Sequence, residues 1–171
     1  MQIRPADTGD HAGIGTLLRA VFPTDAEARL VQALRRDDAD SLELIAEDSG
    51  AIVGMVMFSP VEAKSVDGRS VIGLGLAPLA VAEIHRQKGI GAALVETALD
   101  FLTALNPPFF VVLGEPDYYG RFGFEPASNH GWRWDADIEN AVGDAFQIRI
   151  MDKNLMPTAG KISYARAFSE L

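Results

Sequence analysis

The segment from Leu79 to Ala92 constrains the fold of this chain more than any other stretch. An apolar run ending at Val81 passes into a polar connector, which closes with the pattern R-x-x-G-x-G-A, and a helical pattern follows at once. Glycines at a helix N-terminus leave backbone N–H groups free beside the positive end of the helix dipole. Phosphate and pyrophosphate bind at such a terminus. The pattern therefore predicts a βαβ unit that holds a phosphate-bearing cofactor.

Two better-known phosphate loops do not fit this spacing. A dinucleotide fingerprint needs a third glycine where Leu94 stands, and a Walker A loop needs lysine directly after its last glycine, where Ile90 stands. Gly89 and Gly91 have no Cβ, so an anion can approach their amides. Arg86 and Lys88 add positive charge at the rim. The alternative is that these glycines only let a helix pack tightly against a sheet.

Length and composition set the class of protein. The 171 residues predict a single domain over 1–171. A net charge of −9 argues against nucleic acid as a partner. The chain has no cysteine, which excludes disulfides, thiolate metal sites and a thiol nucleophile, and we expect no metal. The start of the sequence lacks the apolar core of a signal peptide, and no apolar run reaches the ~20 residues of a membrane span, so we expect a cytoplasmic protein.

Apolar periodicity predicts the elements around the glycine segment. Helices are expected before Pro23, up to about Arg36, and after Gly89. The last of these is expected to bury Ile90, Leu94, Ala98, Phe101, Leu102 and Leu105. Strands near 42–47, 51–59 and 71–81 form an antiparallel meander, and the wholly apolar run Phe109–Leu113 implies a right-handed parallel crossover. Shorter strands follow near Phe124, Trp132–Trp134, Phe146–Ile150 and Lys161–Arg166. The predicted fold class is α/β (an α+β mixed sheet), with helices on both faces.

A second cluster, Leu113–Phe124, follows the end of the buried strand, where ligand crevices open in α/β sheets. A tyrosine there presents a phenol to a bound ligand. The alternative is that Tyr118 and Tyr119 are packing residues with a hydroxyl at the surface.

With both clusters in view, the sequence resembles the GNAT superfamily of N-acetyltransferases. Arg86–Ala92 matches its acetyl-CoA pyrophosphate motif, and Tyr119 with Gly123-Phe124 matches its Y-x-x-x-G-F signature. Leu79-Ala80-Val81 matches the end of its fourth strand. Within the superfamily the chain looks like a bacterial group of predicted acetyltransferases. Glu83 stands where many members have proline, and an asparagine that often contacts the cofactor has no clear match.

The resemblance implies acetyl-CoA as cosubstrate and a primary amine as acceptor. It implies that the backbone of Leu79, Ala80 and Val81 pairs with pantetheine, and that Arg86, Gln87, Lys88, Gly89, Ile90, Gly91 and Ala92 hold the pyrophosphate. Tyr119 would protonate the leaving thiolate. Because there is no cysteine for an acyl-enzyme, direct attack in a ternary complex is the simplest scheme.

Four questions stay open at the level of sequence: the general base, the acceptor, the oligomeric state and the function itself. Glu115, Glu83 and His85 are candidate general bases, although each is also typical of a solvated surface. The acceptor can be a small molecule or a protein amine, and a homodimer is left open. Two rival functions remain, a non-catalytic acyl-CoA-binding regulatory module and a structural oligomer.

Overall fold

The computed structural model describes residues 1–171 and divides into two compact units. One consists of Met1–Ser59, Ala77–Ala104 and Arg166–Leu171; the other consists of Pro60–Leu76 and Leu105–Ala165. Two long strands supply residues to both units. They are β3 (Ala51–Ser65) and β4 (Ser70–Val81).

The regular elements follow the predicted order, except that a short helix, α4, forms where the sequence predicts only turns. The helices are α1 (His11–Val21), α2 (Ala26–Arg36), α3 (Ile90–Thr103) and α4 (Pro116–Gly120). The remaining strands are β1 (Gln2–Pro5), β2 (Leu42–Asp48), β5 (Phe109–Leu113), β6 (Glu125–Pro126), β7 (Trp132–Trp134), β8 (Phe146–Ile150) and β9 (Gly160–Ser163). No helix is both long enough and apolar enough to cross a lipid bilayer.

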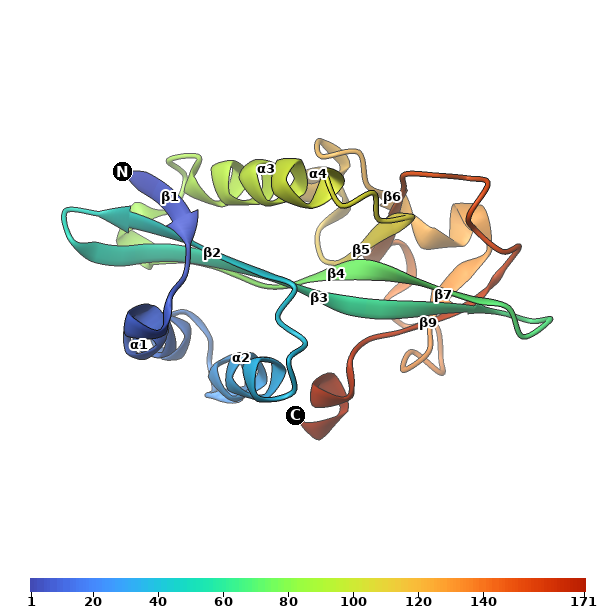
Figure 1. Cartoon of the computed structure of the whole chain (residues 1–171), viewed down its shortest axis with the longest axis horizontal. Coiled ribbons are helices and arrows are strands. Elements are labelled where there is room, and N and C mark those ends of the chain that lie inside the picture. Colours follow the sequence, from blue (N-terminus) through green and yellow to red (C-terminus); the bar gives the residue numbers. More distant parts are fainter. The chain divides into compact units, whose positions relative to one another are not determined.

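The first unit is a sheet covered by helices on both faces. Its strands run in the order β1-β2-β3-β4, with antiparallel pairing of β1 with β2 and of β2 with β3. Figure 1 shows α1 and α2 on one face of these strands and α3 on the other. Because both faces are covered, β2 and β3 carry near-continuous buried runs instead of a strict alternation.

Helix α3 buries four of the six residues predicted to face the sheet, Ile90, Leu94, Ala98 and Leu102. Phe101 and Leu105 are exposed (53% and 70%), whereas Val95 and Leu99 are buried together with the predicted Leu94. The prediction was wrong at Leu105 because that residue lies beyond the end of the helix. It was wrong at Phe101 because the buried face of the helix extends toward Val95 and Leu99 instead. Periodicity predicted the helix and most of its buried face, but not which residues lie at the edge of that face.

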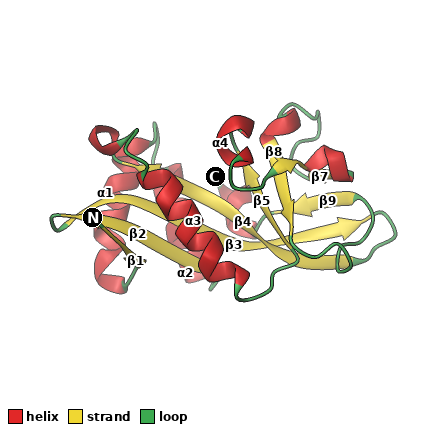
Figure 2. Ribbon diagram, turned by 90° about the horizontal axis from the view of Figure 1, so that it is seen from above, coloured by secondary structure: helices red, strands yellow, loops and turns green.

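The second unit holds the parallel crossover strand. β5 pairs with β4 in parallel and with β8 in antiparallel fashion, and β6 continues from β8. β9 pairs antiparallel with β3 and parallel with β7. Figure 2 shows β9 alongside β3. The predicted mixed sheet, with one parallel connection after the meander, is therefore confirmed.

Gly73 permits the close contact between β4 and β5. A Cβ on Gly73 would lie 2.6 Å from the carbonyl oxygen and ring atoms of Phe109, closer than real Cβ atoms come. A glycine inside this apolar strand indicates either a bulge or a place where another backbone or a ligand comes close, and here it is the backbone of β5 that comes close. The β4–β5 register covers Leu74–Leu76 only. The residue after Ala77 is Pro78, which has no N–H to donate to a neighbouring strand.

Candidate active site

The predicted phosphate loop lies between β4 and α3 in the first unit. After β4 the chain makes one short 3-10 turn (Glu83–His85) and then the exposed residues Arg86–Gly89. The Arg86 side chain donates back to the carbonyl oxygen of Val81 at 3.3 Å (Nε to O). This hydrogen bond ties the connector to the end of the strand, so the loop is held at both its ends.

The helix begins without a side-chain cap. Gly89 adopts a left-handed conformation (φ 80°) as N-cap, a geometry that glycine reaches without strain, and its carbonyl accepts the first helical hydrogen bond, from Ala93 N–H at 2.9 Å. The amides of Ile90, Gly91 and Ala92 precede that bond, so they have no partner inside the helix. The N-terminus of this 14-residue helix is therefore a set of free donors at a positive dipole end.

The charges beside these donors are also unpaired. Arg86 and Lys88 are exposed, and no carboxylate lies within ion-pair distance of either. Elsewhere most arginines are neutralised, as Arg4 is by Asp10 and Arg35 by Glu43. The loop thus offers uncapped amides and two uncompensated cations, and this combination favours a phosphate-bearing ligand.

Gly54 is a residue of the site that sequence reasoning missed. A Cβ there would lie 3.0 Å from Leu94 Cδ1, 3.2 Å from Ile90 Cγ2 and 3.3 Å from the carbonyl oxygen of Ala80. Its missing side chain therefore lets the first turns of α3 rest against the strands. A single glycine inside the apolar run of β3 was the available signal.

The end of β4 presents Leu79, Ala80 and Val81 as predicted strand residues. Ala80 is 2% exposed and faces the core, whereas Leu79 and Val81 are half-buried. Just beyond the strand, the amide of Ala82 donates to the carbonyl oxygen of Val53 at 2.8 Å. This hydrogen bond joins the residue after β4 to the backbone of β3.

Tyr119 lies in the second unit, on α4. Its ring rests on Gly114 at the end of β5, where a Cβ would collide with it, and it packs edge-on against Tyr118 (4.9 Å between ring centroids) and Phe124 (6.1 Å). Burial, with a smaller contribution from Tyr118, raises the pKa of Tyr119 to about 12. The phenol is therefore a proton donor, not a phenolate, at neutral pH.

Gln147 is a second buried polar residue at this end of β5. Its side-chain amide donates to the carbonyl oxygen of Gly114 at 3.1 Å, while its Oε1, also buried, has no hydrogen-bond partner. A glutamine in the strand Phe146–Ile150 gave no sequence signal for this position, because its pairing with Gly114 depends on the fold.

The candidate bases lie in two different environments. Glu83 and Glu115 are exposed, in keeping with the solvated alternative. His85 is mostly buried, with Nε2 3.9 Å from Asp48 Oδ2 and a buried Nδ1 that has no hydrogen-bond partner. Tyr119 and Glu115 belong to the second unit, whereas Glu83, His85 and the loop belong to the first.

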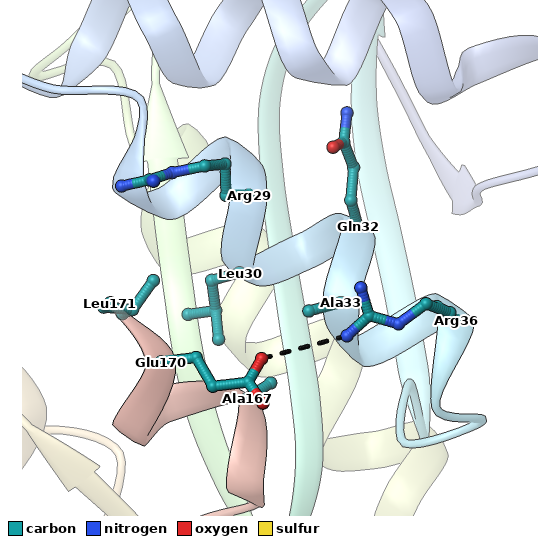
Figure 3. Close-up of a pocket in the computed structure, with 8 residues that line it drawn as sticks. All are labelled: Arg29, Leu30, Gln32, Ala33, Arg36, Ala167, Glu170 and Leu171. Carbon is teal, nitrogen blue, oxygen red and sulfur yellow. Dashed lines mark ion pairs between the residues drawn. The ribbon is translucent and has the colours of Figure 1, made fainter.

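A separate hollow of about 320 Å³ lies beside α2 (Figure 3). Its basic side chains already face carboxylates: Arg36 Nη2 lies 3.9 Å from Glu170 Oε2, and Arg29 pairs with Asp25 at 3.2 Å. None of the predicted cofactor or catalytic residues lines it.

The fold and the loop together define an acyltransferase of the GNAT type. The chain belongs to that family, since residues 2–127 match the acetyltransferase (GNAT) domain. It is 40% identical over 173 residues to the uncharacterised N-acetyltransferase YhbS of Escherichia coli K12, covering 99% of each chain.

Two solved structures share the whole fold. A GNAT family N-acetyltransferase (YhbS) from Escherichia coli, in complex with CoA, has a TM-score of 0.86 and 38% identity, covering 98% of this chain and 91% of that one. An acetyltransferase from Brucella melitensis, in complex with acetyl-CoA, has a TM-score of 0.77 and 28% identity, covering 98% and 97%.

Proposed function

We propose that this acetyltransferase moves an acetyl group from acetyl-CoA to a primary amine by direct attack in a ternary complex. The uncapped N-terminus of α3, beside the unpaired Arg86 and Lys88, is the observation that carries the proposal. The CoA and acetyl-CoA complexes of the two structural relatives support the choice of cosubstrate.

Each part of the loop has a role in this proposal. The amides from Gln87 to Ala92 bind the pyrophosphate, and Arg86 and Lys88 balance its charge at the rim. The backbone of Leu79–Val81 pairs with pantetheine as an added strand would. One N–H of that segment stabilises the oxyanion that forms on the thioester carbonyl.

The reaction transfers one acyl group and two protons. The neutral amine nitrogen bonds to the carbonyl carbon, the C–S bond breaks, and the thiolate takes a proton from the Tyr119 phenol. An alkylammonium has a pKa of ~10.4, so a base or solvent first removes one proton to give the neutral amine, and the nitrogen loses a second proton to a base or solvent as the amide forms. His85, Glu83 and Glu115 are the candidate bases, and a water chain is the alternative.

The loop assignment is tested by Gly91→Asp. The new carboxylate would occupy the phosphate position and repel the ligand, so we expect CoA affinity to fall at least tenfold, or ~1.4 kcal/mol, with the fold retained. Calorimetry measures the affinity, and circular dichroism checks the fold. Gly120→Ala is the matched control, because its Cβ would meet nothing within 4 Å.

Turnover is tested separately by following thiol release from acetyl-CoA with a panel of amines. Release that depends on an amine supports acetyl transfer. CoA binding with no amine-dependent release would instead identify a non-catalytic acyl-CoA-binding module. A melting temperature that CoA does not change would point to a structural oligomer.

A further inference from the structure

Three basic residues form a row across adjacent strands of the second unit. Lys64 on β3 is the register partner of Lys161 on β9, and Lys161 is the partner of Arg133 on β7. Directly paired residues project from the same face of a sheet, roughly 5 Å apart. All three are exposed, while their neighbours Ala63, Ile162 and Trp132 are buried on the opposite face. We call Lys64, Lys161 and Arg133 the basic row.

The basic row has no counter-charge of its own. None of its three side chains takes part in an ion pair or a side-chain hydrogen bond, in a chain whose net charge is −9. Like charges directly opposite each other destabilise a sheet. Two carboxylates lie on the next rung of the same face, those of Glu62 and Asp135, and neither is within ion-pair distance of the row; Asp135 accepts a hydrogen bond from the Ser163 hydroxyl at 2.8 Å. No ion pair within the chain therefore neutralises the three cations.

A shallow hollow lies beside two members of this row, Lys64 and Lys161. It measures about 560 Å³, and Arg133 is not part of its lining; the other lining residues are Ser65, Val66, Asp135, Gly160 and Ser163. Val66 is 89% exposed, so an apolar side chain borders the charges. Gly131 and Ala159 lie on the neighbouring rung, where a Cβ on Gly131 would come within 2.7 Å of Ala159. Because both residues are small, no long side chain projects from the surface at this point.

We propose that the basic row is a docking surface for an acidic segment of a partner protein. Its spacing of roughly 5 Å matches the 5–6 Å between side chains four residues apart on a helix, so three carboxylates can meet three cations. A long nucleic acid fits poorly, because Glu62 and Asp135 lie on the next rung and the whole chain is negative. A small anion would touch the open row on one side only.

The test is a titration of the full ¹⁵N-labelled chain with a helical peptide whose three glutamates are spaced four residues apart, at low ionic strength. The same peptide with glutamines is the matched probe. We expect amide shifts centred on β3, β9 and β7 with the glutamate peptide alone. Absence of these shifts, or equal shifts at basic residues elsewhere, would overturn the proposal.

Variants separate local recognition from overall charge. The triple variant Lys64→Gln, Arg133→Gln, Lys161→Gln should lose at least tenfold in affinity for the glutamate peptide. The control Arg29→Gln, Lys153→Gln, Arg166→Gln removes the same charge at exposed positions elsewhere and should stay within twofold. Equal losses of peptide affinity in both triple variants would show that binding depends only on net charge. Tighter binding of a DNA oligonucleotide at the row would identify a different partner. Either result overturns the proposal.

Measuring thermal stability tests the same surface independently. Because the row repels itself, Lys161→Gln should raise the melting temperature while it weakens peptide binding. A variant that lowers stability and leaves peptide binding unchanged would show that Lys161 serves the sheet alone, against the proposal.

Discussion

Tyr119 combines a family motif with an unusual environment. The residue is 9% exposed, and its ring occupies the space that Gly114 leaves open. Burial holds its pKa at about 12, so its proton is available across the whole physiological range.

We expect Tyr119→Phe to lower turnover by about 10² to 10⁴, the usual effect of losing a general acid. CoA affinity should change little, because the loop amides are untouched. Thiol release with a tolerated amine measures the effect. Tyr118→Phe is the control and should be mild. Wild-type turnover in Tyr119→Phe would assign the acid role to water or another residue, and equal loss in both variants would indicate packing of the aromatic pair.

The same residue predicts how stability depends on pH. The pKa of Tyr119 is higher in the folded chain, about 12, than the ordinary value of 10, so the folded state binds the proton more tightly. Its contribution is complete below pH 10 and is lost as the pH rises from 10 to 12. Denaturant unfolding across this window should show a shallower decline for Tyr119→Phe than for the wild type.

Tyr164 provides the comparison for that measurement. Its pKa is also raised, chiefly by burial, so Tyr164→Phe should reduce the alkaline decline as well. An identical decline in the wild type and both variants would mean that neither phenol resists ionisation in the folded state.

At the scale of elements, the contact between α3 and the strands positions the loop. Gly54 lies under Ile90 and Leu94, within 3.3 Å of either side chain if a Cβ is added. The distance between the N-terminus of α3 and the sheet is therefore set by a residue on β3 and not by the loop itself.

Gly54→Val should destabilise the chain by about 1–3 kcal/mol, the usual cost of overpacking a core. It should also weaken CoA binding, because the added methyl groups push the first turn of α3 away from Ala80. Urea unfolding and calorimetry measure the two effects. In Gly120→Ala, where the added methyl group meets open space, both should be unchanged. Full CoA affinity in Gly54→Val would contradict this role.

Sequence patterns located these elements better than they oriented them. The apolar spacing predicted α3, but Phe101 and Leu105 proved exposed and Val95 and Leu99 buried. The 3.6-residue periodicity defines an apolar stripe about 100° wide on the helix surface. Which residues at the edge of this stripe are buried depends on how the helix packs on the sheet. Gly73 indicated either a bulge or a close approach of a backbone or ligand, and only the structure shows that β5 is what comes close.

At the scale of the whole molecule, β3 and β4 are the elements from which both compact units are built. β3 and β4 each run through both units, so unfolding one unit would disrupt strands that also form part of the other. We therefore expect one cooperative transition, in keeping with the predicted single domain.

Calorimetry tests this expectation through the agreement between the measured enthalpy of unfolding and the van't Hoff value. CoA at about 100 times its Kd should stabilise the folded chain by about 2.7 kcal/mol and shift the whole transition. Two resolved transitions, of which CoA shifts only one, would show that the units unfold independently.

The sequence by itself determined the loop and its helix. Arg86, Gly89 and Gly91 lie within six residues, and their effect on the backbone is local, so their spacing is sufficient to predict a helix start with free amides. Parallel pairing of β4 with β5 followed as well, because a strand, a helix and a buried strand in succession have few other arrangements.

Only the tertiary structure decided the burial of Tyr119, the role of Gly54 and the row formed by Lys64, Lys161 and Arg133. Each depends on which distant segments become neighbours, and residue types alone do not encode that register. A lysine on a strand has the same sequence signature whether it faces a glutamate or another lysine. The pairing of β3, β9 and β7 brought three like charges together, because register is set by the buried face, where Ala63, Ile162 and Trp132 pack, and the exposed face follows.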